Sequence, residues 1–78
     1  MENYSFTASW HDKQNNTRPV TIEEVLKNEF ETDYYRCYLD SGDRINISLD
    51  DNACWVEIDQ GPNYLSRTFG ELIENHFM

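Results

Sequence analysis

The stretch YYRCYLDSGDRINISLDDNACWVEID, residues 34–59, decides the predicted fold. Runs rich in Tyr, Ile, Val and Trp are separated there by two clusters of turn-forming residues, Asp40-Ser41-Gly42 and Asp50-Asp51-Asn52. Gly reaches backbone conformations that other residues avoid, and Asp and Asn side chains hydrogen-bond nearby backbone groups, so both clusters favour tight turns. The stretch therefore predicts three short antiparallel strands joined by two turns.

Alternation gives this predicted meander two faces, because successive side chains of a strand point to opposite sides. In the simplest register, one face is apolar and forms the core, while the other is polar but carries three large aromatic side chains. The predicted core face holds Cys37, Leu39, Ile45, Ile47, Leu49, Cys54, Val56 and Ile58. The predicted outer face holds Tyr34, Arg36, Tyr38, Arg44, Asn46, Ser48, Trp55, Glu57 and Asp59.

Two further elements are predicted before the meander. Apolar residues alternate with small polar ones from Tyr4 to Trp10, which is typical of a strand. Thr21 and Glu24 have the spacing of a capping box, in which each side chain bonds the other residue's backbone N–H. The sequence thus predicts a helix from Thr21 to the region 31–33, with an apolar stripe of Ile22, Val25, Leu26 and Phe30.

After the meander, Thr68 and Glu71 repeat the capping-box spacing and predict a second helix that runs to the C-terminus. The expected fold is a single α+β domain over residues 1–78, in the order β-α-β-β-β-α. Both helices should cover one face of an antiparallel sheet, because each has one apolar stripe to bury. The stripe of the second helix comprises Phe69, Leu72, Ile73, His76 and Phe77.

The charge of the chain limits its partners. Fifteen acidic residues against six basic ones give a net charge of −9, and there is no basic stripe to bind nucleic acid or an anionic membrane directly. No run of about 20 apolar residues and no basic leader with an apolar core is present, so we expect a cytoplasmic protein. In the meander order Cys37 and Cys54 are separated by a middle strand, too far apart for a disulfide, so both are predicted to be free, buried thiols.

The sequence contains the residue types of a catalytic pair and of metal ligands, but not their spacing. His11 beside Asp12 has the residue types of a general base and its orienting carboxylate, but the sequence places no nucleophile near them. His11, His76, Cys37 and Cys54 are zinc-ligand types without zinc-site spacing, and the turn aspartates lack the pattern of a calcium loop. We therefore predict no catalytic residues, no cofactor and no bound metal.

Acidic and aromatic residues are the predicted partner-binding set. The acidic groups lie on the first predicted helix, at the meander turns and on the outer sheet face. The aromatic groups lie on that same outer face, and Tyr and Trp are typical interface anchors. A solubilising role for the acidic residues, and cover of the aromatic face by a loop, remain open. The predicted set is Glu23, Glu24, Asp40, Asp43, Asp50, Asp51, Glu57, Asp59, Tyr34, Tyr38 and Trp55.

Three functional hypotheses follow. The first is a small, acidic, non-enzymatic inhibitor that blocks a basic, nucleic-acid-handling protein. In size and charge alone it resembles the nucleic-acid mimics with which phages block host defence, and immunity proteins against nuclease toxins. The second is a structural or regulatory homodimer with a merely solubilising acidic surface, paired through the aromatic face or an edge strand. The third is a small hydrolase or metal-dependent enzyme.

Overall fold

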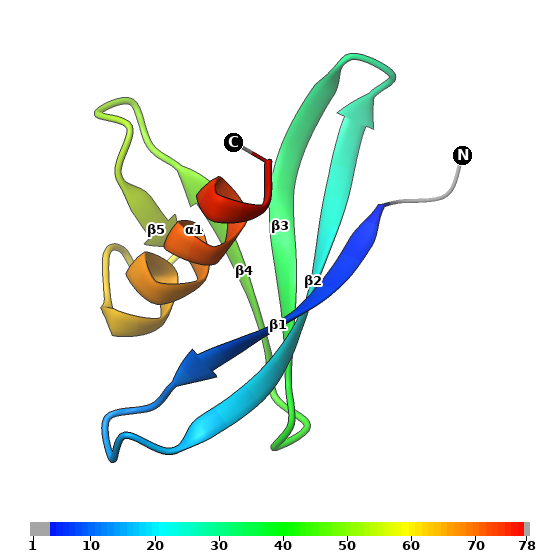
Figure 1. Ribbon diagram of the computed structural model, residues 1–78. Coiled ribbons are helices and arrows are strands. Elements are labelled where there is room, and N and C mark those ends of the chain that lie inside the picture. The colour runs from blue at the N-terminus through cyan, green and yellow to red at the C-terminus, as the bar shows by residue number, and fades with distance from the viewer. Residues whose placement is uncertain (1–3, 78) are drawn as a thin grey trace.

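In the described part of the chain, five antiparallel strands in sequence order and one helix make up the fold (Figure 1). The computed structural model describes residues 4–77. Each strand pairs with the next along the chain, giving the sheet order β1-β2-β3-β4-β5. The elements are β1 (Ser5–His11), β2 (Thr17–Asn28), β3 (Glu31–Leu39), β4 (Arg44–Leu49), β5 (Trp55–Glu57) and α1 (Tyr64–Phe77).

The predicted β-α-β-β-β-α order with two helices is wrong, because the segment predicted as the first helix is strand β2. Val20 and Ile22 are buried on one face of this strand, whereas Thr21 and Glu23 lie on the other. The expected capping box does not form, since the backbone N–H of Glu24 donates to the carbonyl of Tyr4 at 2.7 Å. A central place between β1 and β3 satisfies the backbone on both sides, and this tertiary context outweighs the local helix signal.

Pro19 fits inside this central strand without breaking the sheet. Hydrogen-bonded and non-bonded residue pairs alternate along the β1–β2 ladder, and the bond from the Glu24 N–H to the Tyr4 carbonyl shows which pairs are bonded. By that alternation the nitrogen of Pro19 faces β3, where the last pair is Val20 with Leu39. The missing N–H therefore lies beyond the end of the β2–β3 ladder and removes no hydrogen bond from it.

Helix α1 confirms the predicted C-terminal helix but begins four residues before the expected Thr68, at Tyr64. Its cap is Asn63, whose side-chain oxygen accepts from the Ser66 N–H at 2.8 Å. The Ser66 hydroxyl in turn accepts from the Asn63 N–H at 3.0 Å, which makes a capping box of these two residues. Ser66 is fully buried, and its hydroxyl lies 3.0 Å from the carbonyl of Trp55, so the cap also attaches α1 to β5.

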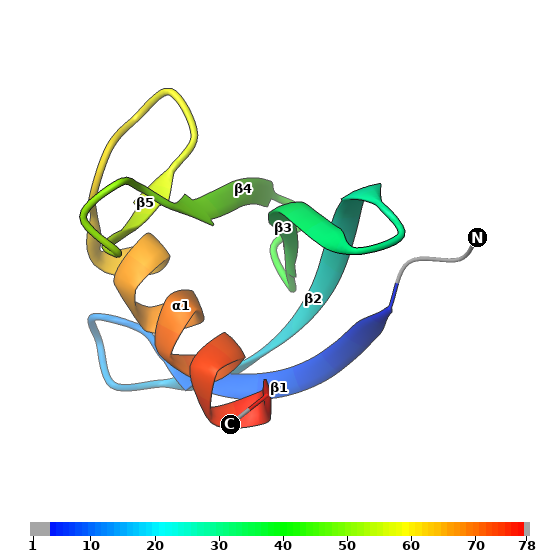
Figure 2. The same cartoon turned by 90° about the horizontal axis from the view of Figure 1, so that it is seen from above.

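The sheet curls around the helix, so that β1 and β5 lie on either side of α1 (Figure 2). The core lies between the concave face of the sheet and α1, and Phe69 fills it at zero exposure. The Phe69 ring meets Trp10 of β1 edge-on, with ring centroids 5.1 Å apart. The core comprises Trp10, Val20, Ile22, Cys37, Ile47, Phe69 and Ile73.

The predicted faces are right for β3 and β4 but reversed for β5. Leu49 pairs with Trp55 and Ile47 pairs with Glu57, and residues paired across strands share a face. Trp55 and Glu57 therefore lie on the concave side, and Val56 faces outward. The turn causes this shift, because the Asp50 carboxylate accepts from the N–H groups of both Asn52 and Cys54 and so extends the turn to residue 54.

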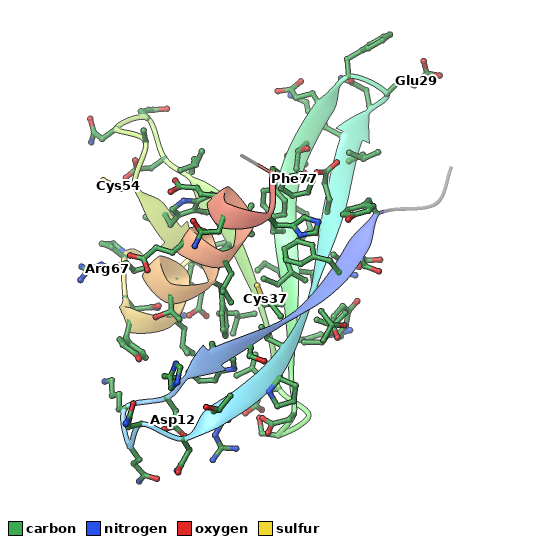
Figure 3. All side chains as sticks on the ribbon, in the orientation of Figure 1. Asp12, Glu29, Cys37, Cys54, Arg67 and Phe77 are labelled. Atoms are coloured by element: carbon green, nitrogen blue, oxygen red, sulfur yellow. The ribbon has the colours of Figure 1, made fainter. Side chains whose placement is uncertain are left out.

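Both cysteines are free, as predicted, but only Cys37 is buried. Figure 3 shows Cys37 at the centre of the molecule and Cys54 at its margin, in the β4–β5 turn. Burial raises the pKa of the Cys37 thiol to about 12. The thiolate is the reactive form, so at neutral pH the folded chain withholds Cys37 from thiol reagents.

Thiol labelling at pH 8 should therefore show two well separated phases. Cys54 should react at the rate of an exposed thiol. Cys37 should react only when the domain opens, so its rate should be at least about 100-fold lower for an unfolding free energy of about 3 kcal/mol. The Cys54→Ser variant should lose the fast phase alone. Two fast phases of equal rate in the folded chain would contradict the burial of Cys37.

Candidate protein-binding surface

A two-stranded arm projects beyond the body of the sheet, and Figure 1 shows it as the extended end of the β2–β3 hairpin. The strand registers define it as residues 25–34. On one side, β1 accompanies β2 only as far as Glu23, opposite Ser5. On the other, the pairing of β4 with β3 ends at Tyr35, opposite Ile47. Among residues 4–77, the two strands of the arm therefore have only each other as neighbours in the sheet.

Phe30 occupies the tip of the arm and is 94% exposed, the most exposed large apolar side chain among the described residues. Asn28 pairs with Glu31, so Glu29 and Phe30 form the turn between the strands. The Asn28 side chain accepts from the N–H of Phe30 at 2.8 Å and fixes the turn backbone. The ring of Phe30 thus lies in solvent, on a turn whose backbone is bonded by the Asn28 side chain.

The arm that carries this aromatic tip also carries three exposed carboxylates. Glu29, Glu31 and Asp33 are all exposed, and Lys27 is the single cation of the arm. The Lys27 ammonium lies 4.0 Å from the Glu31 carboxylate, with both side chains more than half exposed, so it neutralises little of the local charge. Figure 3 shows Glu29 at the far end of the arm, away from the body of the protein. The arm therefore carries a net negative charge next to a fully exposed aromatic ring.

An open, mainly apolar groove of about 320 Å³ lies at the base of the arm. Leu49 and Phe77, each about half exposed, contribute apolar surface at its mouth. Asp33 and Glu74 place carboxylates on its lining. The groove is lined by Thr32, Asp33, Tyr34, Tyr35, Ser48, Leu49, Trp55, Ile73, Glu74 and Phe77.

Tyr35 and Trp55 form the aromatic wall of this groove, with ring centroids 5.6 Å apart. The Trp55 indole N–H donates to the Glu74 carboxylate at 3.0 Å, which fixes the ring against α1. Burial, and then the negative charge of Glu24, raise the pKa of Tyr35, so its hydroxyl stays neutral. The groove therefore offers a fixed aromatic surface with carboxylates around it.

A second cluster lies on the outer, convex face and joins three of the predicted partner-binding residues, Glu23, Tyr34 and Tyr38. The Tyr38 hydroxyl donates to Glu23 at 3.1 Å, and the Arg36 guanidinium lies 3.5 Å from the same carboxylate. Arg36 also donates to the Tyr34 hydroxyl at 2.8 Å. Trp55, predicted to join this face, lies on the concave side, so the outer face presents two of the three expected aromatics.

The predicted acidic residues do not form one surface. Asp40 lies 3.2 Å from Arg18 and Asp43 bonds Ser41, both beside the β3–β4 turn. That turn and the β4–β5 turn, which carries Asp50 and Asp51, lie at opposite ends of β4.

The three remaining predicted carboxylates lie at separate places in the structure. Glu57 faces α1 and accepts from the Asn63 side chain at 2.9 Å, which makes it part of the helix cap. Glu24 pairs with Tyr35 at the start of the arm. Asp59 is exposed in the β5–α1 connection with a φ of 71°, a left-handed conformation that Asp tolerates.

Asp12, considered for catalysis together with His11, and His76, considered as a zinc ligand, both have structural roles. Asp12 accepts from the Arg18 guanidinium and from the N–H groups of Asn16 and Gln14, and the bond from Arg18 is the main reason that its pKa is lowered. His76 stacks on Phe6 with centroids 3.8 Å apart. Within residues 4–77, no three His, Cys, Asp or Glu side chains are placed to hold a metal ion.

Comparisons with known proteins found no match: no protein family, curated protein or solved structure resembles this chain significantly. In the described part of the chain, no helix has the length and apolar character needed to cross a membrane. The surface itself is therefore the basis for a functional interpretation.

The predicted partner-binding set missed Phe30, Glu29, Glu31 and Asp33 on the arm, and Tyr35 and Glu74 in the groove. Phe30 was assigned to the apolar stripe of a helix, a position that would have buried it. The signal for the alternative was its place between Glu29 and Glu31, two residues after Asn28, which is typical of a polar turn. A Phe in a turn of this kind is expected to be exposed, as Phe30 is.

Proposed function

We propose that this chain is a small, acidic, non-enzymatic binding protein whose arm blocks a site on a basic protein that handles nucleic acids. The observation that carries this proposal is Phe30, 94% exposed at the tip of an arm on which Glu29, Glu31 and Asp33 are also exposed. Burying a Phe side chain is worth about 2 kcal/mol. The fold gains none of that energy from Phe30, whereas a partner with an apolar pocket would gain it on binding.

The charges support a basic partner. The chain has a net charge of −9, and the arm presents carboxylates together with an exposed aromatic ring. Carboxylates accelerate the encounter with a basic surface and orient the complex, and a buried aromatic anchor slows its dissociation. Proteins that bind nucleic acid carry basic grooves to contact phosphates, and such a groove is complementary to this arm.

The groove beside the arm extends the proposed contact. Its wall of Tyr35 and Trp55 and its carboxylates, Asp33 and Glu74, suit a segment that combines apolar and cationic side chains, such as a basic amphipathic helix. Arm and groove share Thr32, Asp33 and Tyr34, so a partner that binds the tip of the arm can reach the groove as well. Occlusion of the partner's nucleic-acid site would then require no chemical step.

The test is affinity capture from the native host or its target cell, with elution in steps of salt and identification by mass spectrometry. Wild-type protein should retain a basic, nucleic-acid-binding protein that elutes at moderate salt, and nucleic acid added in excess should displace it. Phe30→Ser should weaken retention at least about tenfold, because the anchor supplies roughly 2 kcal/mol. Glu29→Lys combined with Glu31→Lys should slow association and reduce its dependence on salt.

Matched controls separate the arm from general changes in the surface. Ile58→Ser removes an exposed apolar side chain far from the arm, and Glu71→Lys reverses an exposed charge on α1, outside the predicted partner-binding set. Both should leave capture unchanged. Recovery of no basic protein, or retention that is equal for Phe30→Ser and Ile58→Ser, would contradict the proposed function.

A further inference from the structure

A separate surface lies along the free edge of β1, which Figure 2 shows at one margin of the curled sheet. Hydrogen-bonded and non-bonded pairs alternate along the β1–β2 ladder, and the bond from the Glu24 N–H to the Tyr4 carbonyl shows which pairs are bonded. Ser5, Thr7 and Ser9 belong to the non-bonded pairs, so their N–H and C=O groups point away from β2. The backbone groups of His11 also point away from β2, and its carbonyl accepts from the Tyr64 hydroxyl of α1 at 2.6 Å. Within residues 4–77, Thr7 and Ser9 have no backbone partner on that outward side.

This edge lacks the usual protection against strand pairing. Exposed edges are commonly protected by charged side chains or by Pro, which disfavour pairing with another chain. β1 contains no Asp, Glu, Lys, Arg or Pro, whereas every other strand contains at least one charged residue. In a chain of net charge −9, an uncharged edge is where two copies can approach with the least repulsion.

We infer that β1 pairs antiparallel with β1 of a second copy, about a two-fold axis that passes beside Thr7. Thr7 then exchanges hydrogen bonds with Thr7 of the second copy, and Ser5 with Ser9 on either side, about six bonds in total. The side chains of Ser5, Thr7 and Ser9, on the convex face of the sheet, are small hydroxyls, which pair well across antiparallel strands. The dimer continues the sheet from one copy into the other.

The concave side has room for this pairing. Phe6 of one copy comes opposite Ala8 of the other, and both side chains are only partly buried in the single chain. A groove of about 400 Å³ lies between the edge of β1 and α1, with Trp10 and Leu72 among its lining residues. Side chains that the second copy brings to the concave face can occupy this space. The dimer leaves the arm of each copy free, so it does not depend on the proposed function.

Light scattering over a wide range of concentration tests this inference, with twice the mass of one chain as the expected result. Thr7→Pro should make the protein monomeric, because Pro removes the outward N–H at the axis and leaves the bonds to β2 intact. Thr7→Val keeps the backbone donor and should remain dimeric. If Thr7→Pro fails to fold, Thr7→Glu places two carboxylates opposite each other and should weaken the dimer at least about tenfold.

Amide hydrogen exchange supplies a second readout. The N–H groups of Thr7 and Ser9 should exchange slowly in concentrated protein and faster on dilution, while that of Ile22 in the central strand should stay protected throughout. A monomer at all concentrations overturns the inference, even if the strand of another protein pairs with β1. A dimer that persists in folded Thr7→Pro overturns it as well.

Discussion

Gly70→Ala should destabilise the domain by about 3 kcal/mol, although Ala is the better helix former by about 1 kcal/mol. Gly70 is buried in the middle of α1, where a Cβ would overlap the indole of Trp55. The overlap involves the body of the ring, which strand β5 and the bond to Glu74 hold in place. The ring or the helix must therefore move, and the packing of both is lost.

A double-mutant cycle separates this clash from other effects. In a Trp55→Ala background the same Gly70→Ala change should stabilise the domain by up to about 1 kcal/mol, since only the helix propensity remains. Denaturant unfolding of the four proteins measures both effects. If Gly70→Ala changed the unfolding free energy with the same sign in both backgrounds, Trp55 would not lie against Gly70.

Phe69→Ala should unfold most of the protein at physiological temperature. Replacing a fully buried Phe by Ala costs about 3–5 kcal/mol, which is comparable to the total stability of a domain of this size. The Phe69 ring is completely buried and packs edge-on against Trp10, so its loss opens the core between β1 and α1. Thermal unfolding followed by circular dichroism should show a broad or absent transition.

Phe77→Ala is the matched control, since it makes the same change on the same helix. Phe77 is 48% exposed, so roughly half of its apolar surface already lies in water and its loss should cost about 1 kcal/mol. Equal destabilisation by the two variants would place the centre of the core near the end of α1, against the observed packing.

The parts of the fold that the sequence predicted are those in which one periodicity has no competitor. Alternation through Cys37 and Leu39 in β3, and through Ile45 and Ile47 in β4, fits only a strand, and the structure places these side chains on one face. The stripe of Phe69 and Ile73 likewise fits only a helix. In these segments the pattern of apolar residues was sufficient.

The segment of β2 fits both periodicities, which is why its prediction was wrong. Ile22, Val25 and Leu26 have helical spacing, while Val20 and Ile22 alternate with Thr21 as in a strand. Neighbouring strands decide between the two by providing partners for the backbone on both sides, and a single sequence does not show which strands will be neighbours. The same error hid Phe30, because a residue on the apolar stripe of a helix is expected to be buried.

The reversed face of β5 has a more local origin. A shift of one residue moves every side chain of a strand to the opposite face. The Asp50 carboxylate bonds the backbone as far as Cys54, and Ala53 adopts a left-handed conformation with a φ of 61°. The length of a turn set by such bonds is not visible in residue types alone. Trp55 therefore lies on the concave side, against α1, and not in the predicted patch on the outer face.

The separation of the arm from the core has a consequence for how this protein changes over evolutionary time. Residues 27–31 and Asp33 are exposed, and the core residues all lie outside the arm. Substitutions at the tip therefore leave the packing around Phe69 intact, so they can accumulate without loss of folding. If the tip binds a partner as proposed, a lineage that follows a changing target can replace the residues at the tip while the rest of the chain stays fixed.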